Sequence, residues 1–131
     1  MIEIVTALIR DKQGRVLLVR KNGTASFMQP GGKREANESD LMALAREIRE
    51  ELGCTVVPDS IRFLGTFEAA AANEPGQWVR ASAYKVRVTG RIACEAEIAE
   101  IIWVDPRKPC ERNLAPLMRD IILPLALSLE D

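Results

Sequence analysis

The 131-residue chain contains no histidine. This absence excludes Ser-His-Asp and Cys-His catalytic groups, and it excludes zinc hydrolase sites that use histidine ligands. The three cysteines are far apart and include no Cys-x-x-Cys pair. Their spacing argues against a disulfide framework and against a structural zinc site, and it favours a reducing cytoplasm. Any acid–base or metal chemistry must therefore depend mainly on carboxylates.

The sequence also lacks a long apolar run and an excess of charge of one sign. No stretch approaches the roughly 20 apolar residues that cross a bilayer, and the polar start does not resemble a secretion signal. The 18 Lys and Arg residues nearly balance the 19 Asp and Glu residues. Since a general nucleic-acid binder needs a basic surface, we do not expect nucleic acid as a partner. Without a membrane-spanning run we do not expect a membrane partner either, and we expect a monomer or a homodimer.

The length favours a single domain over residues 1–131, and the 47% of hydrophobic residues can supply its core. Hydrophobic periodicity and turn residues indicate alternating strands and helices. This order of elements predicts an α/β layered domain with a mixed sheet. The expected elements are strands over Ile2–Arg10 and Val16–Val19, an extended Phe27–Gln29, a flexible loop at Gly31–Gly32, a helix over roughly Ser39–Leu52, strands over Ile61–Ala71, Trp78–Val88 and Ile101–Val104, and a C-terminal helix.

Five residues are typical of helix ends. Asn37 or Ser39 could cap the start of the first helix, and Gly53 is the expected C-terminal stop. Asn113 is predicted to cap the C-terminal helix, and Pro124 to kink or end it.

The first predicted helix carries an unusual group of acidic residues. Glu47, Glu50 and Glu51 stand at positions i, i+3 and i+4, so they share an arc of about 100° on the helix. Ionised carboxylates at this spacing repel one another, and the last helical turn favours cations instead. A divalent cation reverses these repulsions, and oxygen ligands suit Mg²⁺ or Mn²⁺.

A solvated helix face is the simpler interpretation of these glutamates, with Arg46 and Arg49 as local partners. The residues before the helix favour a functional interpretation. Pro30-Gly31-Gly32 provides a backbone that can approach an anion or offer a carbonyl to a metal, just before the positive end of a helix.

Together these residues resemble the signature of the Nudix hydrolases. That signature has a Gly, five residues, a Glu, seven residues, then Arg-Glu-aliphatic-x-Glu-Glu-x-Gly-aliphatic. The box covers residues 32–54, and Cys54 in the last aliphatic place is its one departure; a buried thiol behaves as a small hydrophobe. The matching residues are Gly32, Glu38, Arg46, Glu47, Ile48, Glu50, Glu51 and Gly53.

The resemblance implies a fold, a reaction and a metal site. The fold is an α/β/α sandwich with a mixed central sheet, and the reaction is hydrolysis of a nucleoside diphosphate linked to another group. The implied ligands of Mg²⁺ or Mn²⁺ are the carboxylates of Glu47, Glu50 and Glu51, with the backbone carbonyl of Gly31. The resemblance gives Glu38 and Arg46 a supporting role, in which the arginine orients carboxylates.

The general base stays open at this point. Glu47 is one candidate, and a glutamate before Trp103 is the other, because family members recruit a base or an extra ligand from that segment. Glu95, Glu97 and Glu100 are all available there, and Glu100 is the one we take as a catalytic candidate.

The substrate contacts are less specific. Arg20 and Lys21 close the second strand, where related enzymes place phosphate-binding cations, and Gln29 and Gly32 are expected to face the pocket. Asn113 could offer its amide to a purine edge, or it could be only a helix cap.

The short chain favours a nucleoside triphosphate pyrophosphohydrolase that releases a monophosphate and pyrophosphate, and an oxidised purine is one possible base. Hydrolysis of ADP-ribose or of dinucleoside polyphosphates is the alternative. A nucleotide-sensing module without turnover is a further alternative, although such modules usually lose glutamates of the box and this chain keeps them.

Overall fold

The computed structural model describes residues 1–129. No helix in this range is long and apolar enough to span a membrane. The elements, in chain order, are β1 (Ile2–Leu8), β2 (Val16–Lys21), β3 (Gly31–Gly32), α1 (Asp40–Leu52), β4 (Thr55–Val56), the 3₁₀-helix η1 (Pro58–Ser60), β5 (Arg62–Ala70), β6 (Trp78–Lys85), β7 (Val88–Thr89), β8 (Ile98–Val104), the π-helix η2 (Met118–Ile122) and α2 (Leu123–Ser128).

The central sheet is mixed, as predicted. Its order is β3-β1-β6-β5, with β1 parallel to β6 and antiparallel to β3. The strands β2 and β8 form a separate antiparallel pair, and β4 pairs with β7. β8 begins at Ile98 rather than at the predicted Ile101, which brings Glu100 into the strand.

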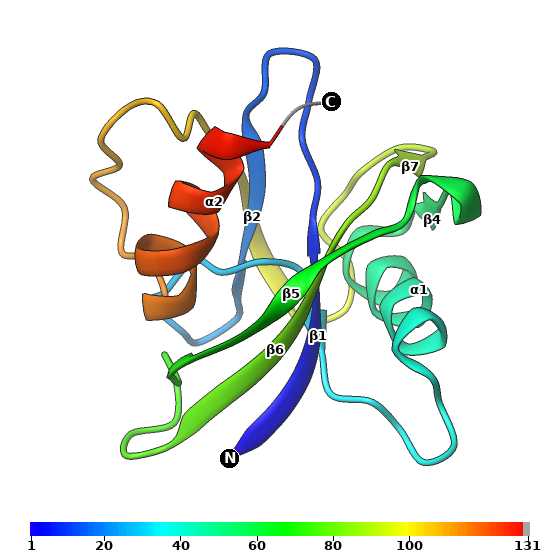
Figure 1. Ribbon diagram of the computed structural model, residues 1–131, viewed down its shortest axis with the longest axis horizontal. Helices are drawn as coiled ribbons and strands as arrows, with labels where there is room; N and C mark the ends of the chain where they lie inside the picture. The colour runs from blue at the N-terminus through cyan, green and yellow to red at the C-terminus, as the bar shows by residue number, and fades with distance from the viewer. Residues whose placement is uncertain (130–131) are drawn as a thin grey trace.

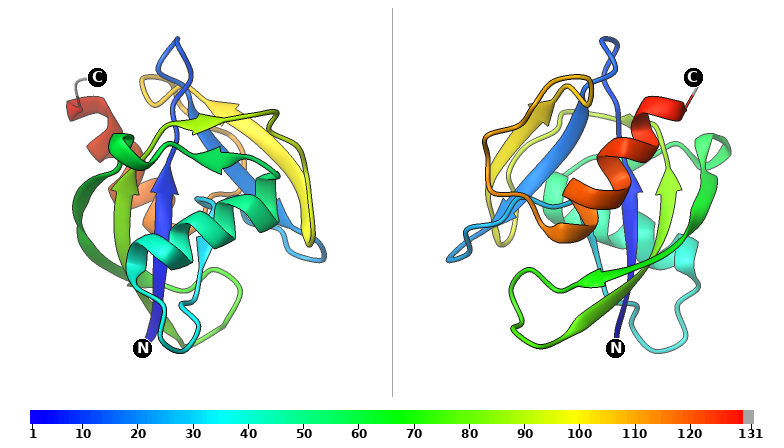
Figure 2. Two further views of the ribbon diagram at one scale, coloured as in Figure 1. Left: turned by 90° about the vertical axis from the view of Figure 1, so that its right-hand side faces the viewer. Right: turned by 60° about the vertical axis from the view of Figure 1, so that its left-hand side comes forward.

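Alternate residues of β1 enter two different cores. Val5 and Ala7 pack with the apolar face of α1, whereas Leu8 and, partly, Ile4 pack with η2 and α2. Successive side chains of a strand point to opposite faces, so one strand separates two helical layers. Figures 1 and 2 show α1 on one side of these strands and α2 on the other. The predicted α/β/α sandwich is thereby confirmed.

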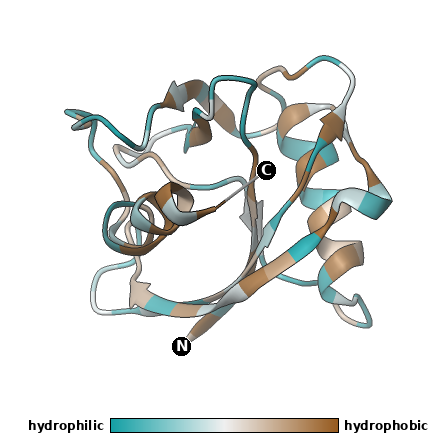
Figure 3. Ribbon diagram, turned by 45° about the horizontal axis from the view of Figure 1, so that its top comes forward, coloured by the Kyte–Doolittle hydropathy of each residue, from teal (hydrophilic) through white to brown (hydrophobic). Residues whose placement is uncertain are grey.

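The hydropathy pattern of the chain follows the same layers. Brown, hydrophobic bands are frequent in the helices and strands, and teal is frequent in the connecting loops (Figure 3). This distribution is expected when each helix buries one stripe against a sheet.

Ser39 is the cap of α1. Its side chain accepts a hydrogen bond from the Met42 amide at 3.2 Å, which satisfies one of the free N–H groups at the helix start. Asn37 lies outside the helix in a left-handed conformation, with φ of 68°. Gly53 ends the helix at φ of 71°, as its position predicts.

The loop expected at Gly31–Gly32 is instead the strand β3. Gly31 pairs with Thr6 and Gly32 with Val5, so both glycines join the edge of the sheet. A Cβ on Gly31 would overlap the carbonyl oxygen of Val5, and the φ of 148° also favours glycine. Gly31 therefore serves a close approach of two backbones, which the sequence alone did not indicate.

The predicted cap at Asn113 is wrong. Helical structure begins only at Pro116, and the Ala115 carbonyl accepts the first helical bond from the Arg119 amide at 2.9 Å. Asn113 is exposed, and its backbone carbonyl accepts from the Phe27 amide at 2.7 Å.

Pro124 does not end the last helix, which continues to Ser128. Instead the winding changes beside it, from the π-helix η2 to the α-helix α2. Because proline has no N–H for the usual helical bond, a local π turn accommodates it.

The substitution Gly31→Ala tests the close approach of β3 to β1. A Cβ there meets the backbone of Val5, and the positive φ adds strain, so we expect a loss of roughly 3 kcal/mol in the free energy of unfolding. Gly23→Ala is the matched control. Gly23 has a φ of 76° and no neighbouring atom within 4 Å, so only the backbone cost of about 1 kcal/mol should remain. Chemical denaturation measures both, and equal losses would contradict the packing argument.

Candidate active site

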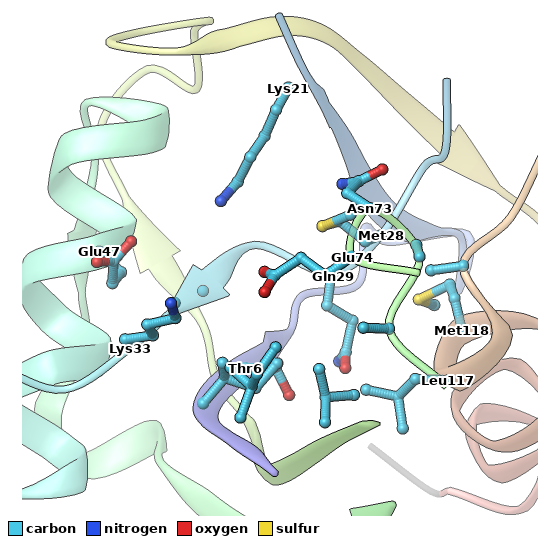
Figure 4. Close-up of a pocket in the computed structure, with 18 of the residues that line it drawn as sticks. Thr6, Lys21, Met28, Gln29, Lys33, Glu47, Asn73, Glu74, Leu117 and Met118 are labelled. Carbon is cyan, nitrogen blue, oxygen red and sulfur yellow. The ribbon is translucent and has the colours of Figure 1, made fainter. Parts of the chain in front are cut away.

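One cavity of about 430 Å³ extends from Arg46 and Glu47 of α1 to Leu117 and Met118 in the C-terminal helical segment. Figure 4 shows Glu47 and Lys33 at one end and Leu117 and Met118 at the other, with Thr6 and Gln29 between them. The first end carries charged side chains, and the second is walled mainly by apolar ones. The apolar wall consists of Ile2, Ile4, Met28, Val79, Leu117 and Met118.

Glu51 is a buried carboxylate directly behind the backbone of β3. Only 2% of the residue is exposed, and its Oε1 accepts a hydrogen bond from the Gly31 amide at 3.0 Å. Its Oε2 has no hydrogen-bond partner within residues 1–129. An unpaired, buried carboxylate oxygen is costly, so this atom indicates a missing cation or proton.

Burial raises the pKa of the Glu51 carboxyl to about 7. The hydrogen bond from Gly31 and the charge of Lys21 lower this pKa, whereas the nearby carboxylates of Glu47 and Glu97 raise it. The free protein therefore holds a proton on Glu51 at mildly acid pH.

Arg46 orients the acidic side chains around it. Its guanidinium donates to both oxygens of Glu38, at 2.7 and 2.8 Å, and to Glu47 at 2.7 Å. These bonds from Arg46 lower the pKa of Glu38 to about 2. Glu38 also accepts from the Glu35 amide at 2.7 Å, so it closes the loop onto the helix.

Gly32 makes room for the Glu47 carboxylate. A Cβ at this glycine would lie 2.7 Å from Cδ of Glu47. The two neighbouring glycines therefore have different tasks, since Gly31 fits against β1 and Gly32 fits against the acidic helix.

Glu50 stands apart from the other two glutamates. Its side chain is 52% exposed and lies 3.4 Å from Arg46. Within residues 1–129, no three Asp, Glu, Cys or His side chains are close enough together to hold an ion as they stand. The donor types nevertheless fit Mg²⁺ or Mn²⁺, because Glu51 has a free oxygen and Glu47, one turn earlier on α1, lies against the neighbouring Gly32. A complete ligand set would require Glu50 to turn inward.

The structure separates the two cations predicted to bind phosphate. Lys21 lines the cavity and lies 3.5 Å from Glu97. Arg20 is not among the lining residues; it pairs with Glu100 at 2.9 Å and donates to the Thr24 carbonyl at 2.9 Å. Arg20 stands opposite Glu100 in the β2–β8 pair, and the register shifts between Arg20 and Lys21, so the two cations have different surroundings.

The three glutamates before Trp103 also lie in different places. Glu97 lines the cavity, whereas Glu100 is held by Arg20 and lies 3.7 Å from Arg112, outside the lining residues. Glu95 lies against the position of Gly53 at the end of α1. The carboxylate that reaches the cavity is therefore Glu97, not the expected Glu100.

Gln29 lines the cavity as expected, and Asn113 does not. The exposed position of Asn113 gives its predicted contact with a purine edge no support. Sequence reasoning did not single out several polar lining residues, among them Thr6, Lys33, Arg34 and Glu74. Lys33 and Arg34 directly follow the two glycines, which is a signal that could have identified them. Thr6 and Glu74 carry no such signal, because only the fold brings β1 and the β5–β6 turn together.

Comparison with known proteins agrees with this geometry. The NUDIX domain family matches residues 2–123. CTP pyrophosphohydrolase from Escherichia coli (strain K12) is 30% identical over 121 residues, covering 88% of this chain and 84% of that protein. An RNA pyrophosphohydrolase from Halorhodospira halophila is 36% identical over 76 residues, covering 58% of this chain and 36% of that protein.

Solved structures show the same fold. The E. coli ORF135 protein has a TM-score of 0.71 at 26% identity, covering 98% of this chain and 87% of that one. A mutator MutT protein from Bacillus halodurans has a TM-score of 0.76 at 23% identity, covering 98% and 84%. The chain belongs to the Nudix hydrolase family, and its homologues include pyrophosphohydrolases.

The raised pKa of Glu51 predicts how stability depends on pH without metal. The folded state binds the Glu51 proton more tightly than the unfolded state does, so this contribution is complete below about pH 4.5 and disappears as the pH rises through about 7. Glu51→Gln keeps the acceptor for Gly31 but removes the ionisation. As the pH rises from 5 to 8, the free energy of unfolding of the variant should therefore increase by roughly 2 to 3 kcal/mol relative to that of the parent.

Denaturation in a chelating buffer across this pH range measures the effect. Glu50→Gln is the control, since it removes the same charge one residue earlier on a side chain that is 52% exposed. Parallel stability curves for the parent and Glu51→Gln would contradict the burial argument.

Proposed function

We propose that the protein hydrolyses a nucleoside triphosphate to a monophosphate and pyrophosphate, with Mg²⁺ or Mn²⁺ as cofactor. The observation that carries this proposal is the division of the cavity. Lys21 and Lys33 lie toward the end beside Glu47, and mainly apolar side chains line the other end (Figure 4). A polyphosphate suits the first end and a flat heterocycle suits the second, because phosphates need cations and a base needs an apolar slot.

The metal would be held by Glu47, Glu50 and Glu51, together with the Gly31 carbonyl. When bound, a divalent cation neutralises phosphate charge and lowers the pKa of a water molecule. The chain itself contributes Arg46, which holds Glu47 in place at 2.7 Å. It also contributes the buried position of Glu51, which fixes one carboxylate beside the β3 backbone.

Glu97 is our proposed general base. Its carboxylate lines the cavity and faces Lys21 at 3.5 Å, so it can accept a proton close to the bound phosphates. Glu47 is the second candidate. Its carboxylate is held by Arg46 at 2.7 Å and is also one of the proposed metal ligands, which leaves it less free to take up a proton.

The names of the relatives are consistent with a nucleotide substrate and leave its identity open. One relative is named for CTP, another for RNA, and a structural neighbour is a UDP-X diphosphatase. The relative named for CTP is similar over most of this chain, which favours a free nucleoside triphosphate.

A substrate panel with Mg²⁺ and with Mn²⁺ tests the proposal. The panel contains nucleoside triphosphates, oxidised purine triphosphates, ADP-ribose and dinucleoside polyphosphates, and the products are identified for each. We expect a triphosphate to give monophosphate and pyrophosphate. Glu51→Gln should retain less than about a tenth of this activity, because a lost metal ligand costs several kcal/mol of transition-state stabilisation. Preferred cleavage of ADP-ribose, or full activity of the variant, would contradict the proposal.

The same ligand set predicts a metal-dependent increase in thermal stability. Mg²⁺ or Mn²⁺ should raise the melting temperature of the parent protein, alone or together with a nucleotide, because the ion binds only the folded arrangement of α1 and β3. The increase should be lost in Glu51→Gln and retained in Glu95→Gln, whose carboxylate lies against Gly53 instead. An equal increase in both variants would place the ion elsewhere.

A further inference from the structure

Two polar side chains in the middle of the cavity have no hydrogen-bond partner within residues 1–129. Gln29 is 5% exposed and Thr6 is 3% exposed, and the unpaired atoms are both amide atoms of Gln29 and the hydroxyl of Thr6. Both residues line the cavity, and Figure 4 shows them between its charged and apolar ends. Neighbouring residues therefore cover most of both side chains, although each side chain lies at the wall of an open cavity.

Such an arrangement destabilises the free protein. A buried amide without partners loses its bonds to water and gains none in return, and an apolar side chain of similar size would avoid this penalty. A donor and an acceptor held together on a rigid wall instead suit a ligand that supplies the complementary pair.

The neighbours of Gln29 restrict what that ligand can be. The buried polar groups are uncharged, so the recognised edge is neutral. The apolar walls on either side suit a flat ring, and the phosphate-binding cations are at the other end of the cavity. Glu74, on the turn between β5 and β6, lines the same space with a carboxylate that can only accept hydrogen bonds.

We infer that Gln29 and Glu74 select a nucleobase with an amino group next to an unprotonated ring nitrogen, the edge that cytosine and adenine share. This inference rests on the proposed function, because it assumes that the phosphates occupy the end with Lys21. The Gln29 amide N–H donates to the ring nitrogen, and its carbonyl oxygen accepts from the amino group. The second amino N–H faces Glu74. Uracil would place a carbonyl oxygen against that carboxylate, and the two acceptors would repel.

Binding of non-hydrolysable triphosphates tests this selection. Calorimetry with the α,β-methylene analogues of CTP and UTP in Mg²⁺ should show a preference of at least about 10-fold for the cytosine analogue, as expected when a site contains buried polar groups that the wrong base leaves unpaired. Equal affinity for the two analogues would overturn the inference.

The substitution Gln29→Met separates recognition from a structural role. Methionine has a similar length and no hydrogen-bonding amide, so the preference should fall to less than about 3-fold while the melting temperature of the free protein rises. A merely structural glutamine predicts the opposite, with a lower melting temperature and an unchanged preference.

Glu74→Gln tests the second contact. Removing the charge should strengthen binding of the uracil analogue several-fold and leave the cytosine analogue within about 3-fold. Glu68→Gln is the matched control on β5, because Glu68 pairs with Arg80 at 3.0 Å and does not line the cavity. If the two variants have the same effect on the uracil analogue, Glu74 does not contribute to the selection.

Turnover distinguishes this inference from the proposed function. Selective analogue binding without hydrolysis of any triphosphate would overturn the proposed reaction and keep the base selection. Efficient hydrolysis of CTP and UTP at equal kcat/KM, with equal analogue affinity, would keep the reaction and overturn the selection.

Discussion

The hydrogen bond from the Gly31 amide to the Glu51 carboxylate is the contact on which the site depends. It joins the edge of the central sheet to α1 across 3.0 Å and keeps a carboxylate at 2% exposure. Gly31 can make this bond only because β3 lies flush against β1, where a Cβ would overlap Val5. The fold therefore uses a close contact between two strands to hold an acidic group out of water.

The positive charge of Arg46 offsets the repulsion between the carboxylates around it. The acidic helix and the loop before it place four carboxylates around one guanidinium, with Glu38 and Glu47 at 2.7 Å and Glu50 and Glu35 at 3.4 and 3.5 Å. Glu51 alone has no such contact, and its pKa is raised to about 7 by burial. The three glutamates that share one face of α1 therefore differ in their surroundings. Glu50 is exposed, Glu47 is paired closely with Arg46, and Glu51 is buried.

The motif and the helix ends could be predicted from the sequence because they depend on local spacing. Ser39 and Gly53 bound α1 through backbone chemistry that acts within a few residues. The strand at Gly31, the separation of Arg20 from Lys21 and the choice of Glu97 over Glu100 depend on strand register instead. β2 and β8 shift register between Arg20 and Lys21, and no spacing along the chain records that shift.

The two ends of the cavity differ in how the sequence encodes them. One continuous segment builds most of the charged end. Two glycines, a capped helix and its glutamates follow one another in this segment, so a sequence motif identifies them. The other end is assembled from β1, the extended segment at Gln29, the β5–β6 turn and the C-terminal helix. Thr6 faces it only because alternate residues of β1 point away from α1. Because distant segments build this end, no single motif in the sequence encodes it. The acidic helix can therefore be recognised from local spacing, whereas the residues of the apolar end come together only in the tertiary structure.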